Sequence, residues 1–73
     1  MQFYEYEGYT IYPTPQLVTE SRCWFIELII KNKNVIKKYD DKNFFTTEAE
    51  AVFHSLLYGK KLIDDGIIFI NQA

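Results

Sequence analysis

The clearest pattern along the chain is a strict alternation of side chains in the stretch RCWFIELIIK. Large apolar residues recur there at every second position, and the opposite side of the same stretch is half apolar. Such a segment is typical of a strand with neighbours on both edges, so residues 22–31 are predicted to be the central strand of a sheet. Its continuous apolar side consists of Trp24, Ile26, Leu28 and Ile30.

Two further strands are predicted, one before this segment in the chain and one after it. Residues 3–12 are rich in tyrosine and β-branched side chains, but their apolar phase breaks at Glu7-Gly8, where a β-bulge would restore one face. A tight turn at Glu7-Gly8 is the alternative, and it is disfavoured because Asn or Asp is preferred there. The prolines that follow predict a turn-rich connection. Asn32-Lys33-Asn34 predicts a hairpin loop, residues 35–40 a third strand, and DDKN a closing turn.

A helix is predicted over residues 47–65. Thr47 and Glu50 have the spacing of a capping box, in which a hydroxyl and a carboxylate satisfy backbone N–H groups of the first turn. Gly66 is a plausible left-handed residue just after the last turn. The apolar residues 67–73 then form a short tail, which could pack within the chain or on a neighbour.

This helix is apolar on two opposite sides. At 100° per residue, one side gathers the larger side chains together with Gly59, and we expect it to face the sheet. The other side alternates small and large residues at spacings of four, three and four, as in a seam between helices. The predicted core side is Ala49, Val52, Phe53, Leu56, Gly59 and Ile63, and the predicted second seam is Ala51, Ser55, Tyr58 and Leu62.

Together these elements predict a single domain, residues 1–73, of the α+β class. It is a three-stranded antiparallel sheet with one C-terminal helix packed on one face, in the order β-β-β-α, followed by the apolar tail. A composition with 48% hydrophobic residues and only three glycines supports order throughout. At 73 residues the chain is near the lower limit for a stable core without disulfides or metal, which favours support from a partner.

Three short motifs resemble those of a group of small bacterial proteins built from three antiparallel strands and one helix. The motifs are Tyr-x-Gly-Tyr-x-Ile-x-Pro at 6–13, Phe-x-Thr-x-x-Glu-Ala at 45–51 and Gly-x-x-x-Ile-Asp at 59–64. Similar proteins are uncharacterised or labelled HlyU-like transcriptional activators. The resemblance therefore implies the fold and a regulatory role, and it assigns no site residue.

The net charge is −2, yet residues 31–42 hold five lysines against two aspartates. A basic hairpin of a three-stranded sheet can contact nucleic acid, which makes this segment an alternative binding site. The acidic total and the single arginine weigh against that hypothesis, and lysines that protect an exposed sheet edge are the more common explanation. The alternative nucleic-acid contacts are Lys31, Lys33, Lys37, Lys38 and Lys42.

Catalytic chemistry finds little support in the sequence. His54 is the only histidine and Cys23 the only cysteine, so the chain holds neither a zinc motif nor an internal disulfide. No glycine-rich phosphate loop occurs. We predict that the protein is not an enzyme and takes no cofactor or metal. Without a secretory or membrane-spanning stretch, we expect it in the cytoplasm.

The sequence thus predicts a non-enzymatic interaction module, bound to another protein or to a second copy of itself, with no membrane or small-molecule ligand. Small size and two-sided apolarity motivate this prediction. An outer face of the sheet left bare by a single helix is a further patch, predicted to hold Tyr4, Tyr6, Tyr12, Phe25 and Ile29. The predicted interaction residues are Ala51, Ser55, Tyr58 and Leu62 of the helix with Ile67, Ile68, Phe69 and Ile70 of the tail.

Overall fold

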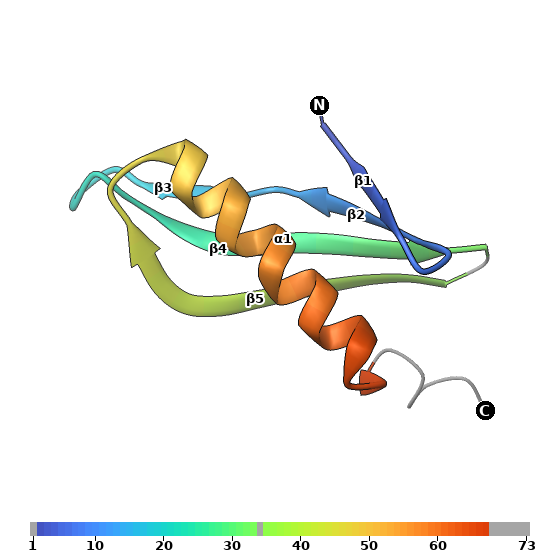
Figure 1. Cartoon of the computed structure of the whole chain (residues 1–73). Coiled ribbons are helices and arrows are strands. Elements are labelled where there is room, and N and C mark those ends of the chain that lie inside the picture. The colour runs from blue at the N-terminus through green and yellow to red at the C-terminus, as the bar shows by residue number, and fades with distance from the viewer. Residues whose placement is uncertain (1, 34, 68–73) are drawn as a thin grey trace.

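The strand β4 (Cys23–Asn32) lies at the centre of the sheet, as its alternation predicts. A computed structural model describes residues 2–33 and 35–67. β2 (Tyr9–Pro13) and β3 (Gln16–Val18) pair antiparallel with successive halves of one edge of β4, and β5 (Val35–Phe45) pairs along its other edge. The helix α1 (Glu48–Asp64) runs diagonally across one face (Figure 1). The α+β class with a C-terminal helix is confirmed, but within these described residues the sheet has five strands and not three.

The N-terminal segment is a hairpin, because β1 (Tyr4–Tyr6) folds back onto β2. Glu7 and Gly8 have φ angles of 50° and 82°, which is the pattern of a type I′ turn. The predicted bulge and the single strand over 3–12 are therefore wrong. The break in the apolar phase marks a turn, which brings Tyr4 opposite Ile11 on the same face of the sheet.

The proline segment does more than connect two strands. Pro13 ends β2, and the chain then returns to the same edge of β4 as β3, which the sequence did not predict. The Thr14 N–H donates to the Glu27 carbonyl at 2.8 Å and keeps the segment in register across the interruption. Residues 13–18 thus remain attached to the sheet although prolines remove two backbone donors.

The longest strand, β5, extends beyond the predicted third strand. A hairpin at Lys33, with φ of 48°, leads into it as predicted, but the DDKN stretch is not a terminating turn. Residues 41–43 stand opposite Ile26 alone, so they form a bulge in a strand that continues to Phe45. The Asp41 carboxylate accepts from the Lys42 N–H at 2.7 Å and stabilises the bulge. Figure 1 shows β5 curving toward the start of the helix.

The two ends of α1 match the prediction. The Thr47 hydroxyl accepts from the Glu50 N–H at 3.2 Å, which is the expected N-cap, whereas the Glu50 carboxylate accepts from the Thr47 hydroxyl at 3.0 Å in place of the backbone N–H of a full capping box. After the last turn, Gly66 has a φ of 74° and its N–H donates to the Ile63 carbonyl at 3.1 Å. The helix therefore begins and ends where local side-chain chemistry places its boundaries.

The face of α1 that packs on the sheet is mostly the one predicted to be free. Gly59 and Ile63 face the sheet as expected, but Ala49 and Phe53 are exposed. Tyr9, Ile11, Leu28 and Ile30 already fill the space above the sheet, so the helix can approach only along a row of small residues. The buried helix residues are Ala51, Ser55, Gly59, Leu62 and Ile63.

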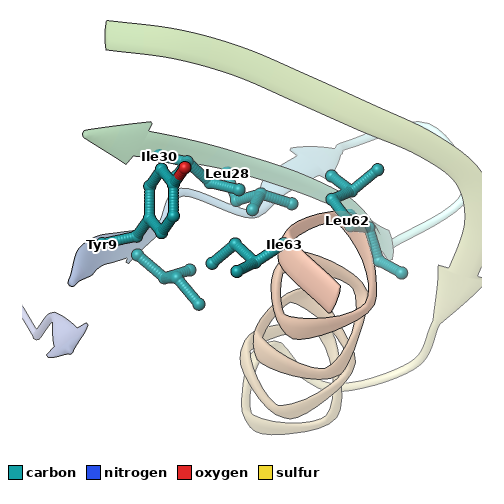
Figure 2. Packing of buried hydrophobic residues seen from close by; sticks show 7 residues of the cluster. Tyr9, Leu28, Ile30, Leu62 and Ile63 are labelled. Carbon is teal, nitrogen blue, oxygen red and sulfur yellow. The ribbon is translucent and has the colours of Figure 1, made fainter. Parts of the chain in front are cut away.

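Gly59 marks the closest approach of helix and sheet. A Cβ atom on this residue would lie 3.0 Å from Leu28 Cδ1 and 3.1 Å from two carbons of Ile11. Beyond this point Leu62 and Ile63 reach down to the sheet and close the core against Tyr9, Leu28 and Ile30 (Figure 2). The core therefore combines large side chains of the sheet with small and then large ones of the helix.

We expect Gly59→Leu to destabilise the protein by about 1–3 kcal/mol, because overpacking of the contact with Leu28 and Ile11 exceeds the gain in helix propensity. Chemical unfolding in urea measures the change. Lys60→Leu, one position further on the exposed side, is the matched control and should change stability by no more than about 0.5 kcal/mol. Equal stability of the Gly59→Leu variant and the wild type would contradict the close approach.

Candidate functional site

Most of the predicted helix seam is in contact with the chain's own sheet. Ala51 and Ser55 have no exposed surface, and Leu62 is buried. Tyr58 is half-buried, and its hydroxyl donates to the Asp40 carbonyl at 3.5 Å. The prediction that this face meets a partner is therefore wrong, because a docked helix presents little of it. Ile67 is exposed, and Ile68, Phe69 and Ile70 lie outside the described residues.

A groove of about 720 Å³ lies on the side of α1 that was predicted to be core. Phe53, with 57% of its surface exposed, lines this groove with Val52 and Leu56. The facing wall comes from the N-terminal hairpin and the proline segment. The lining residues are Gln2, Tyr4, Pro13, Thr14, Pro15, Gln16, Glu48, Ala49, Val52, Phe53 and Leu56.

The proline segment makes the wall of this groove stiff. Pro13 and Pro15 have fixed φ angles, and Pro13 is buried at the end of β2. The Thr14 hydroxyl, between the two prolines, donates to Glu27 Oε2 at 3.3 Å, and the side-chain amide of Gln16, just after Pro15, donates to the same oxygen at 3.0 Å. The groove is thus bounded by a segment whose backbone and side chains are both anchored to the central strand.

Glu27 holds this anchor from the face of the sheet opposite the helix. Its side chain is only 12% exposed, and Oε1 lies 3.4 Å from Lys38 Nζ on β5. One carboxylate therefore connects the segment at Thr14 and Gln16 to the opposite edge strand. A partly buried carboxylate needs such partners, because desolvation of an unpaired charge is costly.

His54 lies between two aromatic rings. Its imidazole stacks on Phe45 with ring centroids 4.3 Å apart and meets Phe53 edge-on at 5.4 Å. Within residues 2–33 and 35–67, no group of three or more His, Cys, Asp or Glu residues could hold a metal ion. The histidine thus contributes to packing between the helix and the end of β5.

The five lysines of the alternative site are distributed over both faces of the sheet. Lys31 and Lys38 stand opposite Ile36 and Ile29 on the face away from the helix, whereas Lys37 stands opposite Ile30 on the helix face. The other two lysines are at the hairpin tip and in the bulge: Lys33 and Lys42. Nucleic-acid binding through these lysines stays a prediction, now with only part of the cluster on one surface.

The sheet face away from the helix carries a scattered apolar surface. Phe25 and Phe44 contact each other edge-to-face at 6.1 Å, and Phe3 packs near Tyr12 at 5.7 Å. Tyr12, Phe25 and Ile29 lie on this face as predicted. Tyr4 and Tyr6 do not, because the hairpin turns them to the helix side, opposite Ile11 and Tyr9.

No family model, curated protein or solved structure matches this chain. The resemblance to small bacterial proteins and to HlyU-like activators therefore stays an expectation. No described helix is long and apolar enough to cross a membrane. A function must therefore be inferred from the surface features of the structure itself.

A hydrogen bond joins the N-terminal hairpin to the last residue of α1. The Tyr6 hydroxyl donates to the Asp64 carboxylate at 2.7 Å, and Lys60 Nζ lies 5.6 Å from the centre of the Tyr6 ring. The bond to Asp64 raises the pKa of Tyr6 above 10.0, with smaller contributions from burial and from nearby negative charge. Burial is the main cause that raises the pKa of Tyr39 and Tyr58.

A raised tyrosine pKa gives a definite dependence of stability on pH. The folded state holds the Tyr6 proton more tightly than the unfolded state. The stability that the protonated Tyr6 contributes is therefore complete below pH 10.0 and is lost as pH rises through the pKa of the folded state. We expect Tyr6→Phe to make the alkaline loss of stability shallower in unfolding experiments above about pH 9. Tyr12→Phe leaves the bond to Asp64 intact and is the control. Identical alkaline profiles for Tyr6→Phe and wild type would contradict the bond.

Proposed function

We propose that the protein is a non-enzymatic, cytoplasmic interaction module that binds an extended apolar segment of another protein in the groove beside α1. The observation that carries the proposal is the position of Phe53, a large aromatic side chain left exposed beside Val52 and Leu56 in a groove of about 720 Å³. Aromatic side chains in such grooves contribute a large share of binding energy. Folding does not require this exposure, because the sheet is covered by the other side of the helix.

The wall of the groove favours an extended ligand. Among the described residues β3 pairs only with β4, so its second edge is open beside Gln16, where a partner strand could add to the sheet. Pro13 and Pro15 hold the wall in an extended form before the ligand arrives, which lowers the entropic cost of binding.

Charge restricts the ligand further. Among the described residues that line the groove, Glu48 is the only charged one, and it lies in the first turn of the helix. An acidic segment would meet this carboxylate, whereas a neutral or basic one would not be repelled. The proposed ligand is thus a short apolar stretch with a neutral or basic flank.

A random peptide library displayed on phage and selected on the wild-type protein tests this function. We expect the selected peptides to be apolar, and we expect Phe53→Asp to weaken their binding at least tenfold, measured by fluorescence polarisation, because it removes the central aromatic contact. Leu57→Asp is the matched control, because Leu57 is exposed on the same helix and does not line the groove.

Three results would contradict the proposed site. The selection could yield no binding peptide, the peptides could bind equally well to Phe53→Asp, or the control variant could lose binding to the same extent. The last two results would place the binding surface elsewhere on the molecule.

A further inference from the structure

The open edge of β5 carries two positive residues on one side of Tyr39 and two negative residues on the other. The sequence from 37 to 41 reads Lys-Lys-Tyr-Asp-Asp. Among residues 2–33 and 35–67, β5 pairs with β4 alone, so its second edge has no strand beside it. Figure 1 shows β5 as the outermost strand on that side of the sheet.

The direction of the backbone groups on this edge follows from one hydrogen bond. The Glu27 carbonyl accepts from Thr14, so the backbone of Glu27 points away from β5. Its partner Asp40 then belongs to a non-hydrogen-bonded pair, and its own N–H and C=O point outward. Because directions alternate along a strand, Lys38 and Ile36 also point outward, whereas Lys37 and Tyr39 point to β4.

Tyr58 gives independent support for this direction. Its hydroxyl reaches the Asp40 carbonyl from the helix, although the contact is long at 3.5 Å. A carbonyl already bonded to β4 would not be turned toward this side. The edge therefore presents outward N–H and C=O groups, with a weak side-chain partner at one of them.

We propose that β5 pairs antiparallel with β5 of a second copy of this chain, about a two-fold axis at Tyr39. In this register Lys38 stands opposite Asp40 of the second copy, and both residues point outward as a hydrogen-bonded pair requires. Lys37 stands opposite Asp41. Because the axis repeats each pair, four oppositely charged pairs form across the seam.

Neighbouring registers fail on charge or on backbone direction. An axis at Lys38 sets two lysines opposite each other, and an axis at Asp40 does the same with two aspartates, so both are disfavoured. An axis between two residues pairs an outward-pointing residue with an inward-pointing one, which leaves the ladder without bonds. The charge pattern therefore selects one register.

The same side chains explain why the edge does not pair indiscriminately. Lysines on an edge strand repel most other strands, and the bulge that begins at Asp41 interrupts the ladder at the end of the charged stretch. The aspartates in mirror order make the second copy the complementary partner. A seam of this length is small, so we expect a weak dimer with a dissociation constant on the order of 100 µM.

A pair of charge variants tests the register. Asp40→Lys sets two lysines opposite each other in a homodimer, and Lys38→Asp sets two aspartates opposite each other, so each variant alone should dimerise about tenfold more weakly or not at all. An equimolar mixture restores both opposite pairs and should form a heterodimer in sedimentation velocity runs. Circular dichroism verifies that each variant is folded.

Matched controls carry the same charge changes away from the edge. Glu20→Lys lies in the turn before β4, and Lys60→Asp lies on the exposed side of the helix. Each control should self-associate as the wild type does. Association that weakens in either control as much as in the edge variants, or association that persists in Asp40→Lys alone, would overturn the proposed register.

Amide hydrogen exchange of the wild type requires no variant. The Lys38 and Asp40 amides should gain protection as the concentration rises to about 1 mM, while Lys37 and Tyr39 are protected throughout by β4. A monomer with fast exchange at Lys38 and Asp40 at all concentrations would overturn the proposal. Protection that is already complete in dilute solution would also overturn it, since the edge would then be covered within one chain.

Discussion

The close approach of α1 to the sheet at Gly59 determines how this small protein distributes its surfaces. With Leu28 and Ile11 about 3 Å from where a Cβ would be, the helix can dock only along its row of small residues. This rotation buries Ala51 and Ser55 and turns Phe53 outward. The groove, the exposed aromatic side chain and the position of His54 beside Phe45 all follow from that one steric condition.

Local signals in the sequence were reliable where a few neighbouring residues determine the structure. The structure contains the alternation of β4, the hairpin at Lys33, the N-cap at Thr47 and the left-handed Gly66. Each depends on backbone preferences or side-chain hydrogen bonds within a short stretch. The turn at Glu7-Gly8 was misinterpreted because Glu is uncommon at φ of 50°, although the phase break was visible.

The choice between the two helix faces could not be made from apolarity alone. Both faces hold apolar residues, and the deciding quantity is the space left by side chains of the sheet, which depends on long-range contacts. A usable signal was present in the spacing of four between Ala51, Ser55 and Gly59, since small residues in register permit close packing. The continuation of β5 through residues 41–43 was equally nonlocal, because it depends on pairing with β4.

Because α1 packs on the sheet through its row of small residues, the residues that folding requires differ from those that line the groove. Folding restricts Ala51, Ser55 and Gly59 to small residues, and it asks little of Phe53, whose ring lies largely in water. In a set of related sequences, drift at the small positions would be purged by loss of stability alone. Persistence of an aromatic ring at position 53 would instead record selection for something outside the fold, so this single position can reveal whether the groove has been used in evolution.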